Sequence, residues 1–476
     1  MSQLPPKCRR GRRLIALAAL ALLTGCASYT DQTTQLRTAW TVGDFPSAAK
    51  IAAEAAKQAP SRDAVLWNLE AGTAASAAGD PAASMAAFQQ ADNQFDYWDT
   101  QPEISISRET AALLVNQTTL PYRGRDYDRI MESTYQALNY LKLGKYDEAR
   151  VELNRALERQ RTAVDKNAKR IEAAKDAAEK SAADGGYNVQ AAQNDPRFQQ
   201  QLQQVYGPLA GFKFYSDYVN PFTTYLQGVC LMARPQSPSD YESARVDFER
   251  VRAMIGNNAY IDADCALATK LAGGTGTMPA LTYVIFETGL APTRQETSIN
   301  IPVFLASKDV PYFGVAFPRL EFNGQFDPGL VVQATGQPPL GTALLCDMDA
   351  VVAQEFRNDL PEVVVKTLIS SGAKAAALFG LHQETRKNDL ADTLTQLGGL
   401  LYQAATNHAD LRTWSTLPKQ FLFCRLPTPP DHKLSLTSDA THETRVVDLT
   451  AGGVTMVYVK SAAAGNHLAI QVFNLR

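Results

Sequence analysis

The sequence predicts an α+β protein in which a domain of helical hairpins precedes a β-sandwich-like domain with an inserted helical hairpin. Three observations predict this order. Residues 27–270 are rich in alanine, have helical periodicity and hold few strand signals. Short β-branched and aromatic runs, separated by Gly, Pro and Asp, follow from residue 281. A helical stretch at 348–412 interrupts these runs.

The N-terminus has the pattern of a secretory signal. Basic residues without any acidic one precede an apolar run from Leu14 to Leu23. This run is too short for a membrane-spanning helix, which needs about 20 residues. The segment Leu23-Thr24-Gly25-Cys26 resembles the lipobox of bacterial lipoproteins. That resemblance implies cleavage after residues 1–25 and acylation of Cys26; an ordinary signal with a chance Cys is the alternative.

Residues 26–34 then form the lipidated Cys and a tether. In bacterial lipoproteins an Asp after the acylated Cys retains the protein at the inner membrane, and here that position is Ala27. The resemblance therefore implies an outer-membrane lipoprotein that faces the periplasm, with outer-membrane lipid as its first partner. Several acyl chains hold a protein stably at a membrane, whereas one chain is marginal.

The rest of the chain is acidic. Removing residues 1–25 takes away five of the 46 basic residues and none of the 49 acidic ones, which leaves a net charge of −8. An acidic surface argues against nucleic acid as a partner and against electrostatic adsorption to membranes. The apolar content of 45% is that of a globular protein, and about 450 residues suit two or three domains.

Four cysteines follow Cys26. The periplasm permits disulfides, and proximity in the sequence favours the pairs Cys230–Cys265 and Cys346–Cys424. The alternative is that all four are buried free thiols, which behave as small apolar residues. Both interpretations stay open, and none of the four cysteines has the spacing of a metal site.

Turn signals recur within residues 35–271. Gly43, Gly79 and Gly144 each precede small and aromatic residues at helical spacing. These offsets resemble the tetratricopeptide repeat, in which a Gly turn joins two antiparallel helices and small residues let the helices approach closely. The spacing departs from that family, because 36 residues separate the first two glycines and 65 separate the next two. An unrelated helical bundle is the alternative. The matching positions are Ala48, Ala55, Gly72, Phe88, Ala91, Ala137, Ala149, Leu153, Ala156, Gly228, Ala244, Phe248 and Val251.

A long helical arm is predicted at about 154–205, because charged residues three and four apart support a solvated helix there. The Gly-rich stretch 272–278 follows as a linker between two independently folded units, since few contacts should cross such a stretch. The β-rich domain comprises residues 279–476.

The insertion at about 348–412 is predicted to be a helical hairpin. Asp359 is a candidate N-cap and Pro361 sits near the first helical position, so the first helix should run from there to about Leu381. Leucines from Leu390 to Leu401 mark one stripe of a second helix. We expect the apolar stripes to cover one face of the sheet.

Three segments carry a wider resemblance. They are Tyr283–Pro292, Phe317-Pro318 and Asp410–Pro418, the last containing Arg412-Thr413-Trp414. With the lipobox they resemble an uncharacterised family of bacterial tetratricopeptide-type outer-membrane lipoproteins. No activity is known for that family. Its members often accompany lipoprotein activators of penicillin-binding proteins, which implies a role in the cell envelope.

No catalytic constellation is evident, so we expect a non-enzymatic protein without cofactor or metal. The five histidines have no metal-ligand spacing. The pattern Ser371-x-x-Lys374 occurs inside a predicted helix and lacks the other motifs of penicillin-recognising enzymes. A cell-wall enzyme or regulator is one alternative, and a structural subunit of a homo-oligomeric envelope complex is another. The enzyme would need acids and a His from the β-rich part: Glu287, Asp347, Asp349, Glu355 and His382.

The expected activity is protein–protein interaction with other envelope proteins through the helical repeats. Helical repeats offer concave surfaces formed mainly by the first helix of each hairpin. Aromatic and Asn residues at such positions suit capture of an extended peptide, and a loop Trp before Leu417-Pro418 is a further anchor candidate. The alternative is that the same side chains are packing residues. The candidates are Trp67, Asn68, Tyr140, Tyr225 and Trp414.

Overall fold

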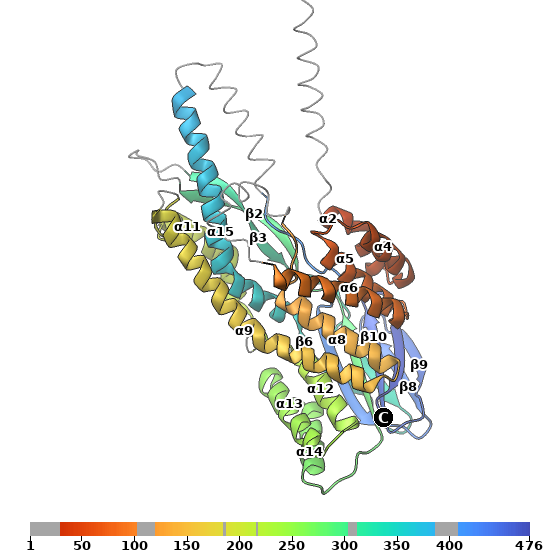
Figure 1. The fold of residues 1–476 in the computed structure, drawn as a ribbon. Coiled ribbons are helices and arrows are strands. Elements are labelled where there is room, and N and C mark those ends of the chain that lie inside the picture. The colour runs from red at the N-terminus through yellow and green to blue at the C-terminus, as the bar shows by residue number, and fades with distance from the viewer. Residues whose placement is uncertain (1–28, 102–119, 184–186, 216–217, 303–311, 386–407) are drawn as a thin grey trace, which may run out of the picture.

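Helices form the N-terminal part of the protein and strands the C-terminal part, with one long helix inserted between two strands, which confirms the predicted α+β class. This arrangement comes from a computed structural model (Figure 1). Cys26 lies outside the described residues. The structure describes residues 29–101, 120–183, 187–215, 218–302, 312–385 and 408–476, with side chains to residue 372 in the fifth range.

The N-terminal helices form one continuous stack. Each helix from α3 to α14 packs against the next described one in the chain, apart from the short helices between α9 and α12. The bounds of these helices are α2 (Tyr29–Gln32), α3 (Thr34–Thr41), α4 (Phe45–Gln58), α5 (Ala64–Ala77), α6 (Pro81–Thr100), α8 (Asp126–Lys142), α9 (Tyr146–Ala183), α12 (Pro221–Ala233), α13 (Ser239–Ile255) and α14 (Ala259–Ala272).

The predicted glycine turns join helices of this stack. Gly43 and Gly79 have φ of +78° and +84°, a left-handed conformation that glycine adopts without steric cost. The next residue, Asp44 or Asp80, accepts a hydrogen bond from a backbone N–H in the first turn of the following helix. A Gly-Asp pair thus ends one helix and begins the next.

Small residues bring the two helices of a hairpin close together. A Cβ atom added at Gly72 of α5 would lie 2.5 Å from the ring of Phe88 on α6. A Cβ added at Gly228 of α12 would likewise lie 2.7 Å from the ring of Phe248 on α13. These contacts give a physical reason for the pairing of glycine and phenylalanine in the sequence.

Gly72→Ala should therefore destabilise the protein by about 1–3 kcal/mol, because the new methyl group overpacks the Phe88 ring. This loss outweighs the gain of up to about 1 kcal/mol that alanine brings to a helix interior. Urea unfolding measures the difference. Gly211→Ala is the control, since a Cβ there would meet no atom within 4 Å. Adding Phe88→Leu to Gly72→Ala should recover part of the loss, and no recovery would contradict this contact as the cause.

The strands form three sheets. A five-stranded sheet has the order β11-β10-β1-β7-β6, a four-stranded sheet has the order β5-β4-β8-β9, and β2 and β3 form a hairpin. The central strand β1 is parallel to β10 and antiparallel to β7. The bounds are β1 (Leu281–Thr288), β2 (Thr293–Pro302), β3 (Tyr312–Glu321), β4 (Leu330–Ala334), β5 (Leu340–Gly341), β6 (Ala343–Asp347), β7 (Gln420–Pro427), β8 (Lys433–Ser438), β9 (Thr444–Asp448), β10 (Val454–Ser461) and β11 (Ala469–Asn474).

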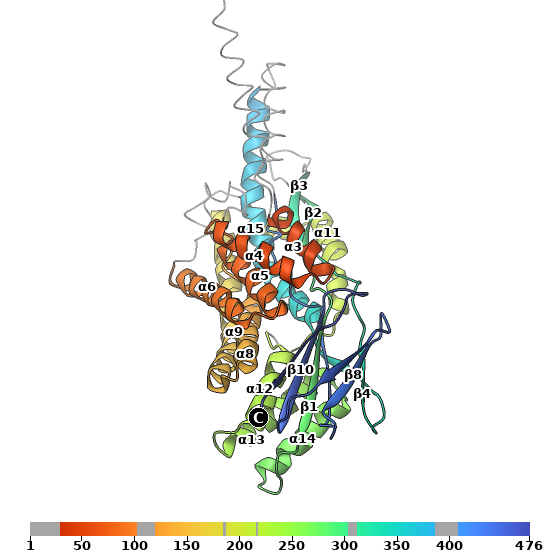
Figure 2. The same ribbon diagram turned by 90° about the vertical axis from the view of Figure 1, so that its right-hand side faces the viewer.

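The five-stranded sheet is covered on both faces. Val284 and Phe286 of β1 belong to a core shared with the four-stranded sheet. Tyr283 and Ile285, which alternate with them, belong to a core shared with the helices. Figure 2 shows α12 to α14 on one side of β1 and β10, and β4 and β8 on the other. Burial on both faces explains why β1 reads as a continuous apolar run.

The inserted helix covers the small β2–β3 sheet rather than the sandwich sheets, so its expected position was wrong in part. Helix α15 (Met348–Thr385) packs against α9 and β3, and it contacts the five-stranded sheet at β7. The predicted start was also wrong, because Asp359 and Pro361 lie within α15. Proline removes one helical hydrogen bond, but buried side chains such as Phe356 hold the preceding turns in place. The predicted second helix lies outside the described residues.

The predicted arm is one long helix that packs against other elements along one side. α9 ends at Ala183, and the chain returns through α10 (Val189–Gln193), α11 (Pro196–Tyr206) and the 3-10 helix η2 (Gly207–Gly211). The C-terminal part of α9, with α10, α11, β2, β3 and α15, surrounds a third apolar core that includes Phe198 and Phe317. Figure 1 shows α9 and α15 side by side.

Residues 273–280 have no regular secondary structure and are mostly exposed, as a linker requires. The two parts that they join nevertheless share one apolar core, which contains Phe222 of α12 together with Phe421 of β7. The rings of these two residues stack with centroids 4.0 Å apart. The expectation that few contacts cross between the two parts is therefore wrong.

Cys230, Cys265, Cys346 and Cys424 are free thiols, which supports the second of the two interpretations. Cys346 belongs to the core on the helical side of the five-stranded sheet. Cys424 belongs to the core on its other side. A sheet separates these two sulfur atoms, so the predicted bond between them cannot form without rearrangement.

Candidate functional site

The inner face of the helical stack, where sequence analysis placed binding, is filled by the protein itself. In α5, 11 of 14 residues are buried; in α8, 15 of 17; and in α12, 12 of 13. By contrast, only three of the 14 residues of α4 are buried. The first helices of the hairpins therefore face the β-rich part and the loop before β7 rather than solvent.

Trp414 shows how this surface is occupied. Its indole N–H donates to Thr73 Oγ1 at 3.0 Å, and its ring makes edge contacts with Phe88 and Tyr135. The side chain is only 2% exposed. Beside it, the buried carboxylate of Glu70 accepts hydrogen bonds from the backbone N–H groups of Ser415 and Thr416. The loop before β7 is thus bound to the stack as a peptide ligand would be.

Two other anchor candidates are also buried, which corrects the binding interpretation in favour of packing. Trp67 is 2% exposed and makes an edge contact with Tyr29. Tyr225 is fully buried, and its hydroxyl donates to Asp264 at 2.8 Å. Asn68 is partly exposed, but its amide donates to the carbonyl of Ala64 in its own helix.

Tyr140, like Asn68, is partly exposed. Partial burial, followed by the negative charge of Glu152, raises the pKa of this phenol above its usual value. Tyr140 lies near the end of α8, one turn before the Gly144 turn. The sequence-predicted residues are therefore not brought together as one open binding face.

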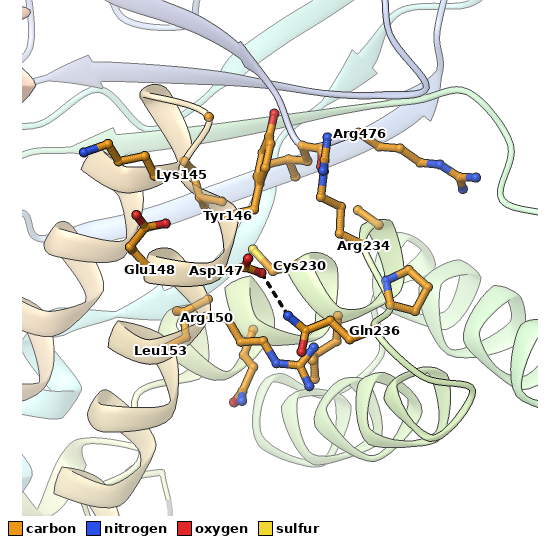
Figure 3. A pocket seen from close by; sticks show the side chains of 17 residues that line it. Lys145, Tyr146, Asp147, Glu148, Arg150, Leu153, Cys230, Arg234, Gln236 and Arg476 are labelled. Carbon is orange, nitrogen blue, oxygen red and sulfur yellow. Dashed lines mark hydrogen bonds between the residues drawn. The ribbon is translucent and has the colours of Figure 1, made fainter.

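A cavity of about 720 Å³ lies at the ends of two hairpins. It is formed by the turn between α8 and α9, the turn between α12 and α13, and the last residues of the chain. Figure 3 shows charged side chains on both sides of this crevice and the Cys230 sulfur within it. Its charged lining residues are Lys145, Asp147, Glu148, Arg150, Arg234 and Arg476.

Hydrogen bonds hold the walls of this hairpin crevice in place. Arg150 makes two hydrogen bonds to Asp240, at 2.7 and 2.8 Å, and this pairing lowers the pKa of Asp240 to about 2. Gln236 donates to Asp147 at 2.9 Å across the crevice. Arg234 stacks over the Tyr146 ring and donates to the carbonyl of Leu475 at 2.8 Å. The two hairpins are thereby fixed relative to each other, while Lys145 and Glu148 remain exposed on the rim.

Sequence reasoning identified Gly144-Lys145-Tyr146 only as a turn. The available signal was a set of charges placed just after the turns of two hairpins, at Lys145–Arg150 and at Arg234. Their meeting depends on the side-by-side packing of α9 and α12. These helices begin 75 residues apart, so local pattern could not reveal the crevice.

The acids considered for an enzyme lie in three separate structural clusters. Glu287 accepts hydrogen bonds from Tyr135 and Tyr458 and pairs with Lys460 at 2.5 Å. Glu355 accepts the backbone N–H groups of Asp126 and Tyr127, at 2.9 Å each, and so caps the N-terminus of α8. Each carboxylate thus has a stabilising role in the fold.

The remaining enzyme candidates whose side chains are described make other contacts. Asp349 pairs with Lys419, and burial raises the pKa of Asp349 to about 6 despite that pairing. Asp347 accepts the backbone N–H of Asp349 at 3.1 Å. Ser371 is buried within α15, and the side chains of Lys374 and His382 lie outside those described.

Lys142 lies beside the Glu287 cluster. Its amine donates to Ser76 at 2.9 Å, and burial, with repulsion from Lys460 second, lowers its pKa from 10.5 to about 7. Between these two pH values the unfolded chain holds a proton that the folded chain has released. Stability contributed by this group therefore rises with pH across that window.

Lys142→Met should reduce the rise in unfolding free energy between pH 7 and 10.5, since methionine cannot titrate. Urea unfolding of both proteins at several pH values measures the difference. Lys145→Met is the control, because it changes an exposed lysine three residues further along. Equal pH dependence of the wild type and the Lys142 variant would contradict a depressed pKa at this amine.

Comparison of the chain with protein-family models, with curated protein sequences and with solved structures finds no match. Within the described ranges, no group of three or more His, Cys, Asp or Glu residues could hold a metal ion. None of the described helices is long and apolar enough to cross a membrane.

Proposed function

We propose that this protein is a non-enzymatic, lipid-anchored scaffold or assembly protein of the outer membrane, facing the periplasm. The lipobox pattern at Cys26 supports the anchor, and the packing of successive helical hairpins supports a tetratricopeptide-like stack. The face-to-face packing of the five- and four-stranded sheets supports a sandwich-like second part. Protein–protein interaction is the activity that such a stack serves best.

The binding site we propose is the hairpin crevice rather than the inner face of the stack. We choose the crevice because the first helices of the hairpins are buried. Their burial leaves no room for a peptide against α5, α8 or α12. A cavity of about 720 Å³ is of a size that ligand sites commonly have. Its rim charges of both signs, Lys145 and Glu148, suit a polar segment of an envelope protein.

Photo-crosslinking tests this site. A photoreactive amino acid at Glu148 should capture a defined envelope protein in intact cells, while the same group at Val446 should not. Val446 is the control because it is 68% exposed on β9, outside the crevice. The same captured proteins from both positions would contradict a specific site at the crevice.

A charge reversal on the rim provides the matched variant. Lys145→Glu should weaken partner binding about fivefold, which corresponds to about 1 kcal/mol for an exposed charge pair. Lys433→Glu, on the exposed side of β8, should leave binding unchanged because Lys433 is distant from the crevice lining. The yield of the Glu148 crosslink in each background measures the effect.

Cys26→Ser tests the anchor separately. The thioether to diacylglycerol forms only on sulfur, so the variant should keep its signal segment and lose acylation. Mass spectrometry of the N-terminal peptide and membrane fractionation measure this outcome. A serine variant that is still acylated and still sediments with the outer membrane would show that another residue carries the anchor.

A further inference from the structure

A second cavity lies at the opposite end of the stack from α13 and α14, beside the N-terminal helices. It has a volume of about 360 Å³ and shares no residue with the hairpin crevice. Helices α2 and α3, the start of β2, the end of β3 and the loop before β7 all contribute to its lining. Figure 1 shows α2 and the β2–β3 hairpin at the same end of the molecule.

Arg294 is the unusual residue of this N-terminal cavity. It is one of the residues that line the cavity, and it is only 5% exposed. Its Nε and Nη2 atoms are buried and have no hydrogen-bond partner among the described residues. The guanidinium stacks over the Phe356 ring, with its carbon 4.8 Å from the ring centroid. A cation–π contact leaves the in-plane N–H groups without an acceptor.

Among the residues that the structure describes, no carboxylate hydrogen-bonds to Arg294. Asp359 is engaged by Arg125 and Arg170, at 3.3 and 3.5 Å. Asp128 accepts hydrogen bonds from the Tyr122 hydroxyl and from the backbone N–H of Arg125. Burial, and then the positive charge of Arg125, lower the pKa of Arg294 below its usual value. Tyr127 and Tyr122, the other ionisable groups that influence Arg294, bear no negative charge at neutral pH.

Two more polar groups in the cavity lack partners. The Nε atom of Arg37 and the hydroxyl of Ser415 are buried and unpaired among the described residues. The remaining ionisable side chains of the lining are already engaged: Tyr29 donates to Glu70, and the exposed Glu321 pairs with Arg319. Buried polar groups in folded proteins are nearly always hydrogen-bonded. Three unpaired groups around one cavity therefore indicate a ligand that accepts hydrogen bonds and carries negative charge.

We propose that the N-terminal cavity binds a phosphate-type oxyanion. The two guanidinium groups of Arg294 and Arg37 supply positive charge and N–H donors, and the Ser415 hydroxyl supplies a further donor. The planar fork of arginine matches the oxygen atoms of phosphate better than a lysine amine does. Binding of the anion compensates a charge that is otherwise buried at high cost.

The position of the cavity indicates lipid headgroups as the source of this phosphate. Tyr29, which lines the cavity, follows Cys26 by three residues, and three residues span at most about 10 Å. With acyl chains on Cys26, the cavity mouth lies at the membrane surface. This choice of source rests on the proposed anchor, whereas the oxyanion site itself does not.

The first experiment uses inorganic phosphate and the full chain in solution. The melting temperature of the wild type should rise with the logarithm of phosphate concentration, relative to sodium chloride of equal ionic strength. Arg294→Met should abolish this rise, and Arg37→Gln should weaken phosphate binding about tenfold. Arg445→Gln is the control, because Arg445 is an exposed arginine on β9 that does not line the cavity.

Two results would overturn the oxyanion site. One is a wild type whose melting temperature does not respond to phosphate. The other is a rise that persists in both Arg294→Met and Arg37→Gln. Neither result depends on acylation of Cys26, so failure of this site is distinguishable from failure of the proposed anchor. If Arg294→Met does not fold, the wild type and Arg37→Gln still decide the outcome.

The second experiment distinguishes the source. A Cys26→Ser protein produced without the signal segment, residues 1–25, should bind phosphatidylglycerol vesicles, and inorganic phosphate should compete with that binding. Vesicles of a phosphate-free glycolipid should not bind. Adding Arg294→Met should abolish vesicle binding, while adding Arg445→Gln should preserve it. Phosphate binding in solution without any vesicle binding would overturn the lipid source and support a soluble phosphate compound in the same cavity.

Discussion

The helical part of the chain, residues 27–272, should lose its cooperative thermal transition when it is produced without residues 278–476. Its inner face depends on the β-rich part for burial. The Phe222 ring stacks on Phe421, and the Tyr225 ring packs against Phe423 with centroids 4.9 Å apart. Alone, the fragment would expose these apolar side chains to water, and each large one contributes about 1.5–3 kcal/mol through its burial.

The buried carboxylate of Glu70 also predicts that the isolated fragment is unstable. Glu70 is fully buried, and three of its hydrogen bonds come from Ser415 and Thr416 in the missing part. Removing those donors leaves a carboxylate buried with little compensation, which costs several kcal/mol. The fragment therefore either loses tertiary packing, which exposes this carboxylate to water, or aggregates through its apolar face.

Circular dichroism melts and binding of a hydrophobic dye measure this result. The fragment should keep helical signal, melt without a sharp transition and bind the dye. Co-production with residues 278–476 is the control and should restore one cooperative transition, because the linker itself is exposed and contributes few contacts. A sharp melt by the fragment alone would show that the shared core is dispensable, as the sequence by itself suggests.

Local features of the fold were predictable because their causes are local. The Gly-Asp pairs at Gly43 and Gly79 end one helix and cap the next within two residues. The apolar run of β1 and the change of composition near residue 272 likewise follow from nearby residues. These elements were found with their approximate bounds because helix caps and hydrophobic period act over a few positions.

The filled inner face was not predictable, because it depends on contacts between distant residues. Trp414 donates to Thr73 across 341 positions of sequence, and Ser415 bonds to Glu70 across 345. A buried Trp and a binding Trp have the same local pattern. Helix α15 was misplaced for a related reason, since residues before Pro361 are held in a helix by partners such as Asp126, 229 positions away from Glu355.

The candidate sites likewise have some features that the sequence shows and others that only the fold shows. The crevice charges at Lys145 and Arg234 are visible as residues, but their meeting requires the packing of α9 against α12. Arg294 lies in a strand that mixes polar and apolar residues, so no local sequence pattern distinguishes it. Its significance comes from burial without a partner, a property that only three-dimensional structure reveals.

Glu287→Ala should lower the free energy of unfolding by about 3–5 kcal/mol, because it leaves the Lys460 ammonium buried without its counter-charge. Glu287 is 2% exposed and Lys460 is 6% exposed, and their charged atoms lie 2.5 Å apart. The hydroxyls of Tyr135 and Tyr458 would also lose their acceptor. This cluster joins α8 to β1 and β10, so its loss weakens the contact between the helical and β-rich parts.

Two variants separate charge from packing in this cluster. Glu287→Gln keeps the shape and one acceptor, so it should cost less than Glu287→Ala. Combining Glu287→Leu with Lys460→Met should recover much of the loss, because replacing a whole buried ion pair by apolar side chains is often close to neutral. Urea unfolding midpoints compare the three proteins with the wild type. If Glu287→Ala instead unfolds at the wild-type midpoint while the protein loses a cell-envelope activity, Glu287 acts in chemistry rather than in holding the two parts together.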